Sequence, residues 1–308
     1  MKHKPVGFVG VGLMGHGMAK NLVEKGFDVA VLGHHNRAPV DDLVKRGARE
    51  AKSAAELAKR GGVVFLCVTG SPQVEALVYG DGGLLKNGRK GLVIVDCSTS
   101  LPASTDRIAK DCAVKGISFI DAPLTRTPVD AEAGRLNSMV GGSTEQFAAI
   151  QPYLAAFCEH IFHAGDIGAG HRLKLINNFF TLGIGAFTAE AFSSCVKFGV
   201  TPKSFVELIS VGAVNSAYFQ RLSGGFLQGN FDVMKFSLAN AGKDVRYFNA
   251  TADDAGLAVP LAAALNQSLK QALALGFGDA MVPAMILAKG KANGMDLAPK
   301  KPAAKKRK

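Results

Sequence analysis

The sequence lacks paired cysteines. Its five cysteines are scattered along the chain, at positions 67, 97, 112, 158 and 195, and none belongs to a Cys-x-x-Cys pair. Closely spaced cysteines are typical of zinc sites and of the disulfide frameworks of small secreted proteins. Their absence argues against both kinds of site, and it predicts that the protein works in a reducing cytoplasm.

Long apolar runs are also missing. The basic start MKHK followed by an apolar segment resembles a secretory signal peptide, but five glycines interrupt the segment, and His16 and Lys20 lie within it or follow it. A helix that spans a bilayer needs about 20 consecutive apolar residues, and we find no such stretch elsewhere. The sequence therefore predicts a soluble protein without a membrane partner.

The net charge of +11 is concentrated at one end of the 308-residue chain. Six lysines and arginines stand in the last nine residues, so the net charge falls by six to +5 without them. A Pro/Ala/Lys segment cannot bury an apolar core, and no aromatic residues alternate with its lysines to stack nucleic-acid bases. We predict a disordered, solubilising basic tail over residues 299–308, with nucleic-acid binding as the less favoured alternative.

The chain has enough length and apolar content for two domains. It is 48% hydrophobic and 20% charged, as ordinary globular proteins are, and single cores stop growing near this length. Strand-type apolar runs alternate with helical patterns in the first half, at residues 28–32, 63–68, 92–95 and 117–120. Past Gly170 only helical patterns remain. We predict an α/β fold, with a Rossmann-type doubly wound parallel sheet domain over 1–166 followed by an all-α substrate and dimerisation domain over 167–298.

A glycine-rich motif follows the first apolar run. In VGFVGVGLMGHGMAKNL, Gly10, Gly12 and Gly15 form the pattern G-x-G-x-x-G between a strand-like run and a helical pattern. Such glycines allow a tight turn, close approach of the backbone to a diphosphate, and close packing of the helix on the strand. A tight loop that merely requires glycine is the alternative. With strand and helix patterns on both sides, the motif predicts dinucleotide binding.

No acidic residue follows the second predicted strand. In dinucleotide-binding domains, a carboxylate there accepts hydrogen bonds from the ribose hydroxyls and repels a 2′-phosphate. This chain reads GHHNR instead, with Asn36 and Arg37. Because a guanidinium binds phosphate with two parallel hydrogen bonds, the sequence favours NADP(H), held at Asn36 and Arg37, with NAD(H) possible. An Arg37 that simply faces solvent is the alternative.

A second polar loop carries an arginine between two threonines. The segment DAPLTRTPVDAEAGRL follows the apolar run at residues 117–120. Beyond a strand end, Arg126 can bind an anionic group while the hydroxyls of Thr125 and Thr127 add further donors. A surface arginine paired with Asp130 or Glu132 is the alternative.

Three polar residues share one face of a helix that is otherwise apolar. AGHRLKLINNFF, from residue 169, carries Lys174, Asn177 and Asn178 at spacings of three and four, which places them on one helix face. Such groups must meet water, a partner or a substrate. For Lys174 alone, a side chain that extends its charge into solvent is the alternative.

Five segments resemble, in order and spacing, the β-hydroxyacid dehydrogenase family. They are GFVGVGLMGHGMAKNL, VDCSTS, DAPLTRTPVDAEAGRL followed by MVGG, GAGHRLKLINN and AGKDV, over about residues 5 to 290. The resemblance implies NAD(P)-dependent interconversion of a hydroxyacid and a semialdehyde, with Lys174 as general acid and base and with Asn178 and Asn177 orienting the substrate. An ammonium beside a carbonyl suits that role, since it can donate a proton as hydride arrives. The resemblance also implies cofactor contacts at Leu13, Met14, Val68, Thr99 and Lys243.

One segment departs from the family pattern. Typical members read DAPVSGG, where amides of Ser-Gly-Gly bind the substrate carboxylate, whereas this chain reads DAPLTRT. The arginine resembles the subgroup of 3-sulfolactaldehyde reductase and γ-hydroxybutyrate dehydrogenase, and it suits a sulfonate or a more distant carboxylate. That subgroup carries an acidic residue after its second strand and prefers NAD, so the substrate and cofactor features point to different relatives. We interpret the protein as a reductase of a small semialdehyde with an anionic tail.

Two other functions stay open. One is an imine reductase on a related scaffold, although such enzymes generally lack lysine at the catalytic position. The other is a non-catalytic nucleotide-sensing or nucleic-acid-binding protein that uses the basic tail.

No metal is expected. No cluster of ligands stands out, and the adjacent His34 and His35 should point apart on an extended stretch. The small residues of LGIGAFTAEAF predict close helix packing between subunits of a homodimer or homotetramer.

Overall fold

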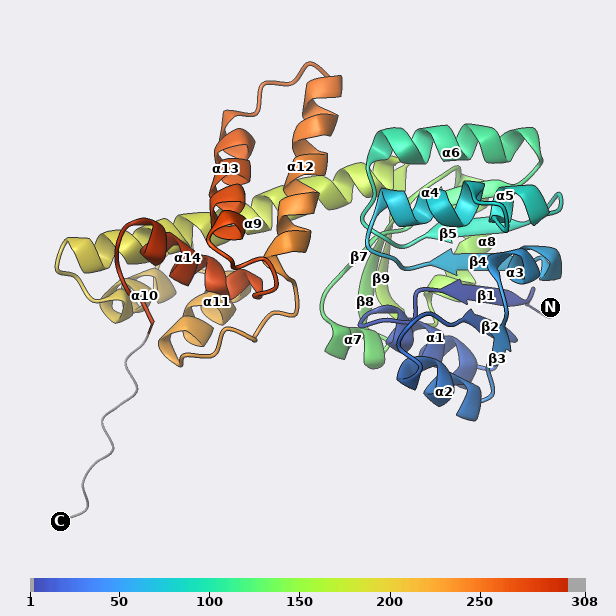
Figure 1. Cartoon of the computed structure of the whole chain (residues 1–308), viewed down its shortest axis with the longest axis horizontal. Helices are drawn as coiled ribbons and strands as arrows, with labels where there is room; N and C mark the ends of the chain where they lie inside the picture. Colours follow the sequence, from blue (N-terminus) through green and yellow to red (C-terminus); the bar gives the residue numbers. More distant parts are fainter. Residues whose placement is uncertain (1–2, 299–308) are drawn as a thin grey trace, which may run out of the picture. The chain divides into compact units, whose positions relative to one another are not determined.

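The computed structural model describes residues 3–298, which form two compact units that meet in sequence between Leu175 and Ile176. The predicted basic tail, 299–308, lies outside the described residues. The predicted domain ranges stay a prediction. The predicted fold class is confirmed, since the first unit holds a predominantly parallel sheet between helices and the second is helical (Figure 1).

The first unit is organised by one sheet. Its strands are β1 (Val6–Val9), β2 (Val29–Leu32), β3 (Arg49–Ala51), β4 (Val63–Leu66), β5 (Val93–Asp96), β6 (Ser118–Asp121), β7 (Leu124–Thr125), β8 (Leu136–Gly141) and β9 (Cys158–Gly165). They lie in the order β3-β2-β1-β4-β5-β6-β8-β7, and β9 also pairs with β8. β1 to β6 are parallel, whereas β8 runs antiparallel to β6 and β7. The expected parallel sheet therefore carries an antiparallel extension.

The strand order reverses direction beside β1. The chain passes from β1 outward to β2 and β3, then returns to β4 on the other side of β1 and continues to β5 and β6. Such a reversal opens a crevice at the carboxyl ends of the strands, where α/β proteins bind ligands. The register aligns these ends, because Val9 pairs with both Leu32 and Leu66, and Leu66 pairs with Asp96.

Alternating side chains give the sheet an apolar core on each face. Phe8 and Phe65 point to one face and Val9 and Leu66 to the other, since successive strand residues alternate. Helices α1 (Gly15–Glu24), α2 (Ala38–Lys45), α7 (Pro128–Glu132) and α8 (Thr144–Leu154) cover the first face. Helices α3 (Ala54–Arg60), α4 (Ser71–Tyr79), α5 (Leu84–Asn87) and α6 (Pro102–Val114) cover the second (Figure 1). Both faces are buried, which explains the nearly continuous apolar strand sequences.

The second unit is built from helices. α9 (Ala169–Lys197) begins in the first unit and continues into the second, which adds α10 (Pro202–Ser210), α11 (Ala217–Leu227), α12 (Leu238–Asp254), α13 (Pro260–Ala274), the 3₁₀ helix η1 (Val282–Ala284) and α14 (Met285–Ala292). Thr201 caps α10, because its hydroxyl accepts a hydrogen bond from the Ser204 amide at 3.1 Å. Phe192 is fully buried at the centre of this unit's core.

Helix α9 departs from the expectation that no stretch is apolar enough to cross a membrane. By length and composition it would do so, with 29 residues and a mean hydropathy of 1.4 in its most apolar window. The mean hydropathy of a window can be high although the window contains isolated polar residues. The sequence analysis instead counted consecutive apolar residues, and a single polar residue ends such a run. A single such helix is weak evidence, since core helices of soluble proteins pass the same test, and 39% of the window is buried.

Candidate active site

The glycine-rich loop between β1 and α1 fits a dinucleotide diphosphate. Gly10 has φ +93°, and a Cβ there would lie 2.1 Å from the Cys67 carbonyl oxygen; a Cβ on Gly15 would lie 1.9 Å from the Gly10 oxygen. Packing therefore requires both glycines. A Cβ on Gly12 would meet nothing within 4 Å, so packing does not explain this glycine, whereas close approach by a ligand does. No side chain caps the start of α1, which leaves that helix terminus available to an anion.

The other predicted cofactor residues of the first unit follow the ends of neighbouring strands. Leu13 is 70% exposed and Met14 is half-buried in the glycine-rich loop. Val68 and Thr99, both half-buried, follow β4 and β5, and the Val68 amide donates to the Ser98 hydroxyl at 3.0 Å. The sheet thus brings these residues to one edge, as the sequence predicts.

At the end of β2, the structure reveals a carboxylate that the sequence analysis missed. Arg37 donates two hydrogen bonds to Glu50 of β3, at 2.5 and 2.9 Å, and one to Asp41 at 3.1 Å. Hydrogen bonds from Arg37 lower the pKa of the Glu50 carboxyl. The sequence analysis predicted no strand at β3, so no local pattern marked Glu50 as a neighbour of β2. Asn36 accepts a hydrogen bond from the Ala38 amide at 3.2 Å.

The expectation that His34 and His35 point apart is wrong. Their ring centroids lie 3.9 Å apart, because the chain bends here instead of continuing as an extended strand. Within residues 3–298, no group of three or more His, Cys, Asp and Glu side chains is arranged to hold a metal ion.

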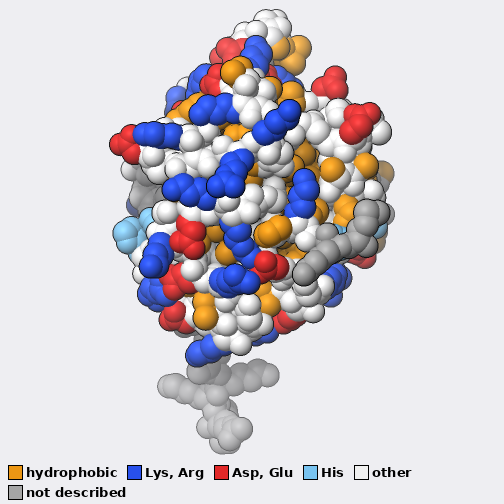
Figure 2. Space-filling model, turned by 90° about the vertical axis from the view of Figure 1, so that its right-hand side faces the viewer, with side chains coloured by type: hydrophobic (Ala, Val, Ile, Leu, Met, Phe, Trp, Pro, Cys, Tyr) orange, Lys and Arg blue, Asp and Glu red, His pale blue; other side chains and the backbone are white. Residues whose placement is uncertain are grey.

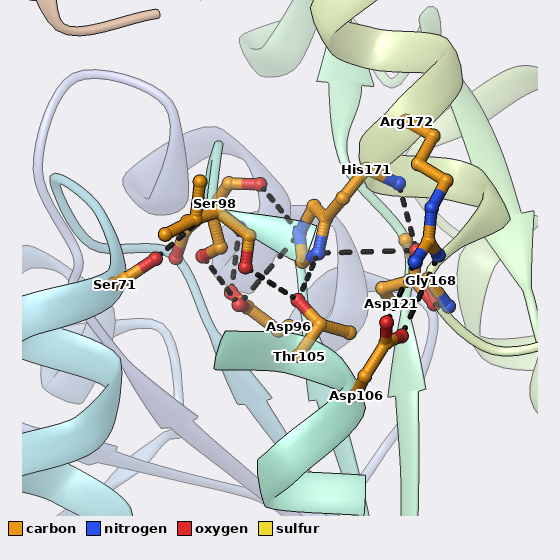
Figure 3. A network of polar contacts seen from close by, with 12 residues as sticks. Ser71, Asp96, Ser98, Thr105, Asp106, Asp121, Gly168, His171 and Arg172 are labelled. Atoms are coloured by element: carbon orange, nitrogen blue, oxygen red, sulfur yellow. Dashed lines mark hydrogen bonds and ion pairs between the residues drawn. The ribbon is translucent and has the colours of Figure 1, made fainter. Parts of the chain in front are cut away.

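A buried polar network fixes the start of α9 (Figure 3). Asp121, the last residue of β6, accepts hydrogen bonds from the Gly168 and His171 amides, each at 2.7 Å. Burial raises the pKa of the Asp121 carboxyl, although the nearby His171 opposes the shift. The carboxylate thereby satisfies two amides at the beginning of the helix, where otherwise unpaired donors need acceptors.

His171 connects this helix start to the segment after β5. Its ring is fully buried, and its Nε2 donates to the Ser98 carbonyl oxygen at 3.2 Å while its Nδ1 lies 2.8 Å from the Thr105 hydroxyl (Figure 3). Asp96 lies 3.7 Å from the same ring. The segment that carries Thr99 and the first turn of α9 are therefore linked through one side chain, three residues before Lys174.

The polar face of α9 lies where the sequence predicts. Lys174 and Asn177 are half-buried and Asn178 is buried. Asn177 donates to the Asn178 side-chain oxygen at 3.1 Å, and Asn178 donates to Asp244 of α12 at 2.7 Å. Asp244 also forms an ion pair with Lys243 at 3.1 Å. The Asp244 carboxylate, in the segment AGKDV, thus orients the Asn178 side chain. From this segment the sequence predicted a role only for Lys243.

The loop after β6 holds Arg126 in an unusual conformation. Its φ is +83°, the only positive value at a residue other than glycine among residues 3–298. The guanidinium pairs with Glu159 of β9, and its Nη1 also donates to the Arg135 carbonyl oxygen at 2.6 Å. The alternative pairing with Asp130 or Glu132 is not observed.

The two threonines beside Arg126 have different surroundings. Thr125 ends β7 and is half-buried. Thr127 caps α7: its hydroxyl accepts from the Asp130 amide at 3.3 Å and donates to the Asp130 carboxylate at 2.6 Å. These hydrogen bonds lower the pKa of the Asp130 carboxyl. Thr127 thus has a structural role in addition to the predicted contact with substrate.

Lysine and arginine side chains are spread over the face of the protein shown in Figure 2. Lysines and arginines there have acidic and apolar side chains between them. This face therefore adds no support for nucleic-acid binding.

Two family models together cover most of the chain. Residues 5–165 match the NAD-binding domain of 6-phosphogluconate dehydrogenase, and residues 168–288 match the NAD-binding domain of NADP-dependent 3-hydroxyisobutyrate dehydrogenase. A nicotinamide cofactor is thereby established for the chain, although the two models do not distinguish NAD from NADP.

Curated relatives are similar over nearly the whole length. 2-(Hydroxymethyl)glutarate dehydrogenase of Eubacterium barkeri is 32% identical over 91% of this chain and 93% of its own. 3-Sulfolactaldehyde reductase of Escherichia coli is 30% identical over 89% of this chain and 91% of its own.

Solved structures support the fold. Mycobacterium tuberculosis 3-hydroxyisobutyrate dehydrogenase with L-serine has a TM-score of 0.81 at 23% identity, covering 92% of this chain and 98% of its own. An imine reductase from Myxococcus stipitatus has a lower TM-score of 0.61 at 18% identity, covering 92% and 98%. Together with the family models, the relatives establish that this chain belongs to the β-hydroxyacid dehydrogenase family of NAD(P)-dependent oxidoreductases.

Proposed function

We propose that this enzyme interconverts a small semialdehyde bearing an anionic tail with the matching hydroxyacid, and that it prefers NADP(H) while accepting NAD(H). The observation that supports this most is Lys174, half-buried on the helix face that also carries Asn177 and Asn178, directly after the turn that His171 and Asp121 fix. At this place Lys174 can donate a proton to a bound substrate.

The chemistry assigns a separate task to each side chain. When bound, the nicotinamide would supply a hydride to the carbonyl carbon of the semialdehyde or accept one from the CH–OH carbon of the hydroxyacid. During reduction, the Lys174 ammonium donates a proton to the carbonyl oxygen and neutralises the negative charge that develops there. During oxidation, the neutral amine takes the proton back. Asn178, whose amide is oriented by Asp244, acts with Asn177 to orient the substrate.

Arg126, with Thr125 and Thr127, holds the anionic tail in this proposal. Glu159 and the Arg135 carbonyl oxygen both contact Nη1 of the guanidinium. A guanidinium has five N–H donors in a fixed planar arrangement, so Nη2 and Nε are left for a carboxylate or sulfonate. The name of the sulfolactaldehyde reductase relative supports a sulfonate among the substrates to test.

The remaining predicted residues bind the cofactor. They are Gly10, Gly12, Leu13, Met14, Gly15, Asn36, Arg37, Val68 and Thr99 of the first unit, with Lys243 of the second. Arg37 would reach the 2′-phosphate of NADP(H), and the loop amides would hold the diphosphate.

The test is turnover by the purified protein and by a Lys174→Ala variant. NADPH and NADH oxidation is followed with sulfolactaldehyde, succinic semialdehyde and a cyclic imine. We expect a semialdehyde to be reduced, and Lys174→Ala to lower kcat about 100-fold or more. Lys197→Ala, an exposed lysine of the same helix, is the matched control and should keep its activity. A loss below tenfold in Lys174→Ala, or turnover of the imine alone, contradicts the proposal.

We also propose a cytoplasmic homodimer or homotetramer. Leu173, Ile176, Phe180 and Phe187 recur along α9 at helical spacing and are 39 to 67% exposed, which suits contact with a second copy of the chain. The free cysteines fit a reducing compartment, and burial raises the pKa of the Cys67 thiol to about 12. Sedimentation of the protein as a monomer at micromolar concentration would exclude the oligomer.

A further inference from the structure

The carboxylate that the sequence lacks after β2 is supplied in space by β3. β2 ends at Leu32, and Gly33 stands where dinucleotide-binding domains usually place an acidic residue for the ribose. A Cβ built on Gly33 would lie 2.8 Å from Arg37 Nη1 and 3.1 Å from Glu50 Oε1. The Arg37–Glu50 pair therefore occupies the space beside this strand end.

Hydrogen bonds to two carboxylates fix the position of the Arg37 guanidinium. β3 runs parallel to β2, and Glu50 pairs in register with Val31, one residue before the end of β2. Both guanidinium ends bind Glu50, through Nη1 to Oε1 and Nη2 to Oε2, and Nη2 also binds Asp41. The Arg37 and Glu50 side chains are 50% and 39% exposed, so a ligand can reach them.

The charges of this trio oppose a phosphate. One guanidinium faces two carboxylates, so Arg37, Glu50 and Asp41 together carry a net charge of −1, whereas an unpaired Arg37 would present +1. A phosphate monoester carries about −1.5 to −2 charges at neutral pH. A 2′-phosphate that binds Arg37 must therefore either displace Glu50 or lie beside two carboxylates, whereas an uncharged 2′-hydroxyl meets no such repulsion. The Glu50 carboxyl, whose pKa Arg37 lowers, is ionised at neutral pH, so its charge takes part in this competition there.

We infer that Glu50 is a specificity-determining residue, which competes with the 2′-phosphate for Arg37 and thereby limits the preference of this enzyme for NADP(H) over NAD(H). The inference rests on the proposed role of Arg37 in cofactor binding. The inference predicts a change in the ratio of the dissociation constants for NADPH and NADH. A loss of folding or of catalysis would not change this ratio in the predicted direction.

The experiment measures cofactor dissociation constants, without substrate, from the change in the fluorescence of NADPH or NADH when it binds. Glu50→Gln removes the charge and keeps the size of the side chain. We expect it to tighten NADPH binding about two- to fivefold, the range of a single exposed ion pair, and to leave NADH binding within twofold. The Kd ratio is then the readout, and it is independent of turnover.

Two further variants locate the effect. Glu24→Gln removes a similar exposed carboxylate, which pairs with Arg46 at 2.6 Å, and should leave the ratio unchanged. In an Arg37→Ala background, Glu50→Gln should no longer tighten NADPH binding, because no guanidinium remains to be released.

Three results would overturn the inference. One is an unchanged Kd ratio in Glu50→Gln, and another is an equal gain in Glu24→Gln, which would indicate a general charge effect. The third is weaker NADH binding with unchanged NADPH binding, which would make Glu50 a direct acceptor for the ribose. Failure of the proposed function looks different, since the wild-type protein would then bind cofactor but reduce no semialdehyde.

Discussion

Arg37 and Arg126 were both predicted to bind anions, and both pair with a glutamate from a neighbouring strand, yet their backbones differ. Arg37 stands before α2 with an ordinary φ of −81° and pairs with Glu50. Arg126 pairs with Glu159, but its φ is +83°. An L-residue in the left-handed region costs roughly 1–2 kcal/mol, so only Arg126 is held at a measurable energetic cost.

The difference in backbone conformation makes Arg126 a stronger indication of a functional site than Arg37. An exposed ion pair without strain forms readily on protein surfaces and contributes little, so the Arg37 pair alone does not require a ligand. Strained residues persist where the surrounding structure holds them, and they gather at functional sites. Position 126 is glycine in the family pattern DAPVSGG, and the positive φ explains that glycine. In this chain position 126 keeps the positive φ that suits glycine, although the residue is an arginine.

Of the three substitutions proposed here, removal of the Arg126 side chain should have the largest effect, and the effect should be on substrate binding. Arg126→Ala is expected to raise KM for an anionic semialdehyde about tenfold or more with a smaller change in kcat, because a hydrogen bond to a charged group contributes about 1.5–3 kcal/mol. Steady-state kinetics measure this. Arg126→Gly relieves the strain as well and should give the same KM if charge is what matters. An unchanged KM in both variants would remove the anion site.

Removal of Arg37 should have a smaller and selective effect. Arg37→Ala is expected to weaken NADPH binding about three- to tenfold and to leave NADH binding within twofold, because the guanidinium is already shared with two carboxylates. Cofactor titration by fluorescence measures both constants. Equal losses for the two cofactors would mean that Arg37 does not contact the 2′-phosphate.

The smallest effect is expected at the cap beside Arg126. Thr127→Ala should lower the free energy of unfolding by about 1 kcal/mol at pH 7, since it removes a helix cap. The folded-state pKa of Asp130 lies below its unfolded value of about 3.9. The part of this stabilisation that comes from the hydrogen bond between the Thr127 hydroxyl and the Asp130 carboxylate is therefore present above about pH 4 and is lost as the pH falls through the folded pKa, whereas the bond from the Asp130 amide remains. Urea unfolding at pH 7 and pH 3 measures both values, and an equal cost at the two would contradict this account.

The nucleotide half of the site was readable from local patterns. Gly10, Gly12 and Gly15 lie between a strand and a helix, and strand ends predicted within one or two residues place Val68 and Thr99 at the same sheet edge. These features depend on residues close in sequence. Glu50, Asp244 and the His171 network were missed because each acts across many residues: Arg37 and Glu50 are 13 apart, whereas Asn178 and Asp244 are 66 apart.

The sequence by itself determined the five parallel strands β1, β2, β4, β5 and β6, the glycine-rich loop, and the polar face of α9, because glycine, apolar and period-3.6 patterns act over a few residues. Tertiary structure decided which carboxylate faces which arginine. Glu50 reaches Arg37 only because β3 pairs with β2, and Glu159 reaches Arg126 from β9, the strand paired with β8. Strand pairing sets these distances, and no local pattern encodes it.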